Sequence, residues 1–293
     1  MLDLSDEAFA ARFRHYVERI GDVLGHADRV KPMTDYCTGL LLPLERKSVE
    51  PMAGATAPER ASAQHQSMLH FVGQSRWSDE AVMDCAYRMV TPSIERSGRF
   101  EALVVDDTSF PKKGTHSVGV KRQYCGQLGK TENCQQVVTV SVASEAASLP
   151  VAARLFLPEL WANDPVLRQK AKVPEHVSHQ SKPDIALDLI RDAIERGVAK
   201  GVVLADAGFG GGASFRIGVS ALGLPYAVAI RPITNVWRQG EAPVPTLRRS
   251  KRGPWPKGQK PAPHRHVPAR PPILAPNPRQ SVAAERLANH QLA

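Results

Sequence analysis

Hydrophobic residues in the first third of the chain recur at helical spacing. The segments 36–44, 60–72 and 78–90 follow this pattern, and Ser78 stands where a helix N-cap is expected. No segment before about residue 100 reads as a strand. We therefore expect an all-helical region over residues 1–98. In its first helix, predicted over residues 5–29, the apolar side chains that share one face are Phe9, Phe13, Tyr16, Val17, Ile20 and Leu24.

The pattern changes near residue 100 to short apolar or alternating runs. Such runs are typical of strands in a sheet that is partly buried. The predicted strands are Ala102–Val105, His116–Tyr124, Gln135–Ala143 and Leu149–Leu157. A long polar and proline-containing stretch, residues 158–182, follows the last of these strands and is expected to form a loop.

Helices and strands then alternate up to about residue 231. An amphipathic helix is predicted at Pro183–Glu195, a strand at Gly201–Ala205, a helix at Ala213–Leu222 and a strand at Tyr226–Ile230. A meander followed by alternating helices and strands predicts an α/β fold. This order resembles the ribonuclease H-like fold, a mixed sheet with flanking helices, and we assign it to residues 99–231.

The positive charge of the chain is concentrated at its C-terminal end. The formal net charge is +9, and residues 232–293 hold 11 Lys and Arg against 2 Asp and Glu, together with 12 of the 24 prolines. A basic, proline-rich segment is typical of a disordered tail that attracts a polyanion such as DNA. A disordered end whose charge has no function is an equal alternative for this segment alone.

Several function classes are not favoured by the sequence. No run approaches the roughly 18 apolar residues of a membrane span, and the acidic, amphipathic N-terminus is not that of a signal peptide. The four cysteines are scattered without a C-x-x-C pair, which argues against a zinc site and against an oxidising compartment. We expect a cytoplasmic protein without a membrane partner.

Acidic residues follow two of the predicted strands. Asp106 and Asp107 lie in "LVVDDTSFPKKG", and Asp206 comes about a hundred residues later. If the two strands pair in parallel, these carboxylates become neighbours and repel each other unless a cation lies between them. Mg²⁺ prefers oxygen ligands, and two such ions can activate an attacking oxygen and stabilise a leaving one at a phosphodiester.

Three other interpretations of these residues remain open. Asp106 and Asp107 can form a capping turn after a strand, and Asp206 can cap the next helix. The run from Gly208 to Ala213 fits G-x-G-x-x-A, the pattern of a dinucleotide-binding oxidoreductase. That mechanism requires an acid about 20 residues further on, but no Asp or Glu follows Ala213 before Glu241.

Several basic residues follow the first acidic pair, Asp106 and Asp107, in the sequence. Lysine and arginine side chains contact the phosphates of a nucleic-acid backbone. The candidate DNA-binding residues are Lys112, Lys113, Lys121, Arg122 and Lys130.

Several longer motifs carry a family resemblance. They include "RKSVEPMA", "LHFVGQSRW", "VVDDTSFPKKGTHSVGVKRQYCGQLGKTENCQ", "RLFLPELWANDP" and "VLADAGFG". Over roughly residues 30–245 the chain resembles the bacterial insertion-sequence transposases of the DDE superfamily, in the branch with the DDT-x-FPKKG signature. The resemblance implies an endonuclease that cuts the ends of its own mobile element and then joins the released 3′-hydroxyl to target DNA.

The resemblance also implies roles for individual residues. Asp107 would be the first metal-binding acid with Asp106 as its neighbour, and Asp206 would be the second. Two Mg²⁺ or Mn²⁺ ions would be held by three acids. Residues 1–98 would bind the terminal inverted repeats of double-stranded DNA, as a homodimer on paired ends, in the bacterial cytoplasm at the nucleoid.

The third acid of the family is a glutamate on a helix that follows an insertion. The only acids after Asp206 are Glu241 and Glu285, and neither has the expected surroundings. We therefore expect a copy truncated before the third acid, with poor catalysis. The alternative within the family is a DNA-binding remnant without catalysis that inhibits full-length transposase.

Overall fold

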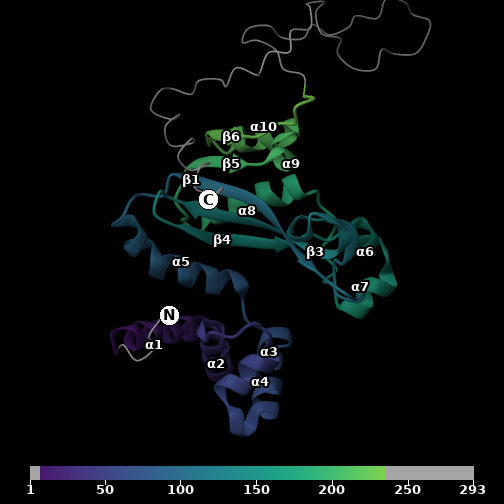
Figure 1. Cartoon of the computed structure of the whole chain (residues 1–293). Helices are drawn as coiled ribbons and strands as arrows, with labels where there is room; N and C mark the ends of the chain where they lie inside the picture. The colour runs from purple at the N-terminus through teal and green to yellow at the C-terminus, as the bar shows by residue number, and fades with distance from the viewer. Residues whose placement is uncertain (1–6, 235–293) are drawn as a thin grey trace, which may run out of the picture.

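The computed structural model describes residues 7–234, and helices fill the first part of this range. In Figure 1, α1 to α4 form a group apart from the sheet, and α5 lies between this group and the sheet. The elements of this part are α1 (Glu7–Val23), α2 (Val30–Leu41), α3 (Val49–Thr56), α4 (Ala61–Gly73) and α5 (Asp79–Glu95), with the short 3-10 helices η1 (Ala27–Arg29) and η2 (Pro58–Arg60).

The predicted helical character of this region is confirmed over its described residues. Ser78 caps α5 as expected, because its Oγ accepts a hydrogen bond from the backbone N–H of Ala81. The first helix is shorter than predicted, since it ends at Val23 and Gly25 adopts a φ of 74°. That left-handed conformation favours glycine and ends the helical pattern.

A six-stranded mixed sheet follows the helices. Strand β3 pairs antiparallel with β1, β2 and β4, whereas β5 pairs parallel with both β1 and β6. The strands are β1 (Ala102–Pro111), β2 (Lys121–Cys125), β3 (Lys130–Ala143), β4 (Ser148–Leu155), β5 (Val202–Ala205) and β6 (Tyr226–Val228).

The remaining helices lie between or after these strands. The longest of them, α8 (Lys182–Glu195), agrees with the predicted helix Pro183–Glu195. It begins after the N-cap Ser181 and ends before Gly197. The others are η3 (Gly126–Leu128), α6 (Glu159–Asn163), α7 (Pro165–Ala171), α9 (Ala207–Gly210) and α10 (Ala213–Ala221).

This arrangement is a mixed α/β fold consistent with the ribonuclease H-like class, so the predicted fold class is confirmed. Strands β1, β3 and β4 form an antiparallel meander, whereas the predicted second strand, β2, pairs with β3 on the side away from β1 and does not lie between them. Strands β5 and β6 extend the sheet in parallel beyond β1. The central position of β1 places its Val105 beside Ala205, the last residue of β5.

Three local predictions were wrong. Strand β1 was predicted to end at Val105 but continues to Pro111, so Asp106 and Asp107 lie within the strand and not in a turn after it. The predicted strand His116–Tyr124 begins only at Lys121, because the preceding residues form a turn in which Gly119 has a φ of 77°. The predicted loop over residues 158–182 contains α6 and α7. Helix α7 forms there because Asp164 accepts hydrogen bonds from the backbone N–H groups of Val166 and Leu167.

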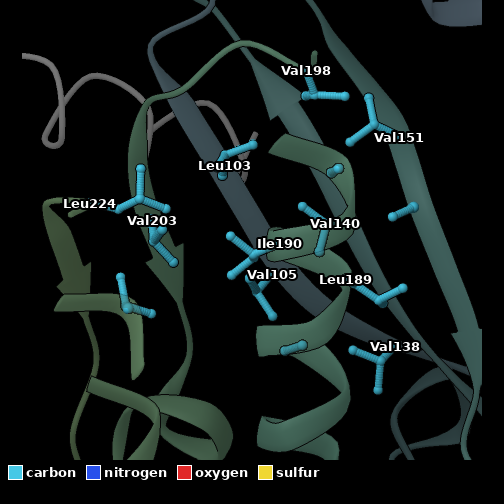
Figure 2. Packing of buried hydrophobic residues seen from close by; sticks show 14 of the residues in the cluster. Leu103, Val105, Val138, Val140, Val151, Leu189, Ile190, Val198, Val203 and Leu224 are labelled. Carbon is cyan, nitrogen blue, oxygen red and sulfur yellow. The ribbon is translucent and has the colours of Figure 1, made fainter. Parts of the chain in front are cut away.

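The main core lies between α8 and one face of the sheet. Side chains alternate along β1, so that Leu103 and Val105 are buried, whereas Val104 between them is half-buried. Figure 2 shows Ile190 of α8 among these buried side chains. Helices α9 and α10 add Phe209 and Phe215 to the same cluster, on the side of the sheet where α8 packs.

Helix α5 joins the N-terminal helices to the sheet. Arg196, directly after α8, forms an ion pair of 2.6 Å with Asp84 of α5. Tyr87 accepts a hydrogen bond from the backbone N–H of Ala199, and its ring stacks on Phe100 at 6.2 Å. Both attachments lie at the end of the sheet where β1 starts, opposite the end where the candidate acids lie.

None of the helices in residues 7–234 combines the length and the apolar character that crossing a bilayer requires. The predicted basic tail, residues 232–293, lies almost entirely outside the described residues, as do Glu241 and Glu285.

Candidate metal centre at the ends of β1 and β5

The carboxyl end of β5 lies beside the middle of β1, which continues to Pro111. The parallel register aligns Val104 with Leu204 and Val105 with Ala205. An aspartate follows on both strands: Asp106 comes directly after Val105, and Asp206 comes directly after Ala205. Adjacent strands lie about 4.8 Å apart, so the predicted parallel pairing brings acidic residues from the two strands together.

Asp106 and Asp107 point to opposite faces of the sheet, because successive side chains of a strand alternate. Asp107 is aligned with the buried Val138 of β3, on the face covered by α8, and its side chain is half-buried. Asp106 is exposed on the other face, where the backbone N–H of Asp107 donates a 2.7 Å hydrogen bond to its Oδ1.

Asp206 is the N-cap of α9. Its Oδ1 accepts hydrogen bonds from the backbone N–H groups of Gly208 at 2.8 Å and Phe209 at 3.3 Å. The predicted capping role is thus present in the structure, and it fixes this carboxylate at the strand end. Because the second carboxylate oxygen makes no such bond to α9, it remains available to a ligand.

Asp106 carries the electrostatic signature of a crowded acidic site. Partial burial raises the pKa of Asp106, and the negative charges of Asp107 and Asp206 raise it as well. The hydrogen bond from the Asp107 backbone and the charge of Lys182 oppose this effect. The net upward shift follows mainly from the burial of the carboxyl, and the two neighbouring negative charges add to it.

The raised pKa of Asp106 predicts a stability effect that depends on pH. A carboxyl group whose pKa is higher in the folded than in the unfolded protein destabilises the folded state when it ionises. The protein therefore loses stability as the pH rises from the unfolded pKa to the folded pKa of the group, and the loss is complete at neutral pH. Asp106→Asn removes the charge and keeps the oxygen that accepts the Asp107 N–H. We expect its Tm at pH 7.5 in EDTA to be about 1–3 °C above wild type.

Thermal unfolding at several pH values checks this expectation. The advantage of the asparagine variant should shrink as the pH is lowered toward 3.8, the ordinary pKa of the group. A variant that is less stable than wild type at neutral pH would contradict the account.

The donor set fits a hard divalent cation with an incomplete protein shell. Within residues 7–234, His, Cys, Asp and Glu side chains nowhere gather in a group of three that can hold a metal ion. The three aspartates therefore do not form a single cluster, which follows from the opposite orientations of Asp106 and Asp107. Mg²⁺ commonly takes only one or two carboxylates and keeps water or phosphate oxygens in its other positions.

The five predicted DNA-binding residues fall into two groups. Glu132 lies 3.8 Å from both Arg122 and Lys130, so their charges are partly offset. The other three residues are Lys112, Lys113 and Lys121. Within the described part of the chain, none of them forms an ion pair with an acidic side chain.

The glycine run after β5 is required for close packing. A Cβ on Gly210 would lie 2.3 Å from the carbonyl oxygen of Ala229 and 2.7 Å from the Cβ of Val228. Gly210 thus allows α9 to approach the chain around β6. This requirement accounts for the glycine without a bound dinucleotide.

Lys182 is the site residue that the sequence analysis missed. It is the first residue of α8, and its ammonium donates a hydrogen bond to Oδ2 of Asp107, 75 positions earlier in the chain. The cap at Ser181 predicts where α8 begins. The sequence carries no signal for which strand the first turn of α8 faces.

Comparisons with known proteins show what the chain is similar to. A family model described as "DDE superfamily endonuclease" matches residues 19–291. A protein of Microchaete diplosiphon, named "Probable transposase for insertion sequence element IS701", is 29% identical over 194 residues. The alignment covers 66% of this chain and 47% of that relative, so the match spans about half the length of the relative.

Proposed function

Because the chain belongs to the DDE superfamily of endonucleases, we propose that it is the aspartate-bearing part of an insertion-sequence transposase. Its reaction is the hydrolysis of phosphodiester bonds at the ends of a mobile element, followed by transfer of the released 3′-hydroxyl to target DNA. The observation that carries this proposal is the parallel register of β1 and β5, which places Asp206 directly after β5 beside the part of β1 that holds Asp106 and Asp107. The similarity to a probable transposase supports it.

Asp107 and Asp206 would hold the divalent ion, Mg²⁺ or Mn²⁺, with Asp106 beside them. Asp107 lies on the sheet face where α8 packs, and α9, which Asp206 caps, contributes Phe209 to the core on that face. When bound, such an ion lowers the barrier by activating the attacking oxygen and stabilising the leaving oxygen. Two ions and a third acid are expected from the family.

The protein's own residues fix the carboxylates. The N-terminus of α9 holds one oxygen of Asp206, and β3 and β5 hold β1 rigidly on both sides. Sites built on strands hold their ligands more precisely than sites on loops. The predicted impairment of catalysis stays a prediction, since Glu241 and Glu285, the acids that follow Asp206, lie outside residues 7–234.

The test is strand cleavage of a supercoiled plasmid by the purified chain. We expect slow nicking in Mn²⁺, none in EDTA and none by Asp206→Asn in Mn²⁺. Nicking that persists in the asparagine variant would contradict the proposal. Metal-dependent DNA binding without any nicking would instead favour the remnant that inhibits full-length transposase.

DNA is the proposed substrate, in the form of terminal inverted repeats and target duplex. The chain would act in the bacterial cytoplasm at the nucleoid, as a homodimer on paired ends, with the N-terminal helices contacting the repeats. Lys112, Lys113 and Lys121 would contact backbone phosphates, and Arg122 and Lys130 would contribute less because Glu132 offsets their charges.

The three lysines give a prediction about salt dependence. Each phosphate contact contributes about 0.9 to the slope of log K against log salt concentration. Replacing Lys112, Lys113 and Lys121 together by alanine is expected to reduce the slope by about 2–3 units. Fluorescence anisotropy with a DNA duplex at several salt concentrations measures this slope.

The matched control is the double variant Arg122→Ala/Lys130→Ala. Its slope is expected to change by less than about 1 unit, because Glu132 already offsets these two charges. Equal changes in both variants would show that the distinction between the two groups is wrong.

A further inference from the structure

Lys182 and Asp107 form an ion pair that is sheltered from water. The side chains are 25% and 29% exposed, respectively. Of the ion pairs in the described part of the chain, only this one and Arg196–Asp84 have both side chains less than one third exposed. Arg196–Asp84 joins α5 to the sheet. The Lys182–Asp107 pair instead lies at the candidate metal centre.

The position of Lys182 is unfavourable for the helix that carries it. Lys182 is the first residue of α8, where the backbone N–H groups create a positive potential that disfavours a cation. The acidic residue expected in a first turn is supplied by Asp184. Helix stability therefore does not explain the lysine, whereas the carboxylate of Asp107 does.

The surroundings hold the ammonium at the edge of the metal centre. Its nitrogen lies 5.7 Å from the centre of the Phe156 ring, a cation–π distance that directs it toward Asp107. The ammonium therefore lies between an aromatic ring and the carboxylate of Asp107.

We propose that Lys182 is the counter-ion of Asp107 in the metal-free protein and a phosphate-binding residue in the loaded one. This inference rests on the proposed function and deepens it. A divalent ion on Asp107 would repel the ammonium, since both are positive. A lysine side chain has four rotatable methylene groups, so the released ammonium can reach a nearby phosphodiester oxygen while α8 stays in place.

Lys182 is a positioning residue for Asp107, and the metal affinity reports on this role. Mn²⁺ binding is measured by electron paramagnetic resonance for wild type, Lys182→Gln and Lys182→Arg. Glutamine keeps a hydrogen-bond donor for Asp107 but removes the competing charge, so we expect the affinity to rise about fivefold or more. Arginine keeps the charge, so the Mn²⁺ affinity of Lys182→Arg is expected to lie within about twofold of the wild-type affinity.

DNA affinity gives the second readout. In Ca²⁺, which occupies oxygen sites, Lys182→Gln is expected to bind a DNA duplex about three- to tenfold more weakly than wild type. In EDTA the variant and wild type are expected to bind the duplex with equal affinity. Lys170→Gln, an exposed lysine of α7, is the control for loss of one charge and should behave alike in Ca²⁺ and EDTA.

The outcomes separate this inference from the proposed function. If Asp206→Asn leaves Mn²⁺ affinity unchanged, the proposed metal centre fails. If Asp206→Asn weakens Mn²⁺ binding but Lys182→Gln does not strengthen it, the role of Lys182 as counter-ion is overturned. If Mn²⁺ binding strengthens while DNA affinity in Ca²⁺ is unchanged, the phosphate-binding role is overturned.

Discussion

Replacing Asp206 by asparagine is expected to lower the affinity for Mn²⁺ at least about a hundredfold. Mutating a residue that only supports a metal ligand already lowers metal affinity about ten- to a hundredfold, and here the ligand itself is changed. The substitution removes a negative charge but not the cap of α9. Asparagine is as good an N-cap as aspartate, so the bonds to the N–H groups of Gly208 and Phe209 are retained. Loss of affinity would therefore report the charge and not a damaged fold.

Asp107→Asn is expected to weaken Mn²⁺ binding to a similar extent, but its effect is less simple. It also breaks the ion pair with Lys182 and leaves that ammonium half-buried without its partner. The Asp206 variant is the cleaner test for this reason. Asp22→Asn, in an exposed ion pair with Arg19 on α1, is the control and should bind Mn²⁺ as wild type does.

Isothermal titration with Mn²⁺, supported by circular dichroism of each variant, measures these effects. Asp106→Asn should change the affinity less than either other aspartate variant, because the side chain lies on the opposite face from Asp107. A ranking in which Asp106→Asn is the most damaging would exchange the roles assigned to the two neighbouring acids.

Gly210→Ser is expected to destabilise the protein by about 3 kcal/mol. The new Cβ would lie 2.3 Å from the carbonyl oxygen of Ala229, an approach that real Cβ atoms do not show. Backbone must therefore move at α9 or near β6. For a protein of this size the loss corresponds to a fall in Tm of about 6–12 °C.

Gly212→Ser is the matched control in the same glycine run. A Cβ there meets no atom closer than 3.7 Å, and residue 212 is the N-cap of α10, where serine is favourable. Its Tm should lie within about 2 °C of wild type. Equal losses at both positions, by calorimetry, would show that the run is needed for flexibility and not for packing at Gly210.

The sequence predicts that strands precede the acidic residues, but it predicts neither the end of β1 nor the directions of the side chains. The apolar runs before Asp106 and Asp206 predict two buried strands, and the intervening helix implies a parallel crossover, which the register confirms. The opposite orientation of Asp106 and Asp107 also follows from strand alternation once β1 is known to continue to Pro111. The prediction ended that strand at Val105, and so missed it.

Contacts between distant segments explain the other differences. The pairing of Lys182 with Asp107, and of Glu132 with Arg122 and Lys130, depends on packing that no local pattern encodes. The basic residues were therefore predicted as one group, whereas the structure divides them. The family resemblance favoured the metal interpretation over the alternatives, because two acids at strand ends are equally typical of capping turns.

The most direct test of the metal centre is an anomalous diffraction measurement on crystals grown with Mn²⁺. The account predicts a peak at the carboxyl end of β5, beside the middle of β1, coordinated by Asp107 and Asp206, with the ammonium of Lys182 displaced from Asp107. Crystals saturated with Mn²⁺ that show no ion at this site, or an ion held without Asp206, would contradict the account.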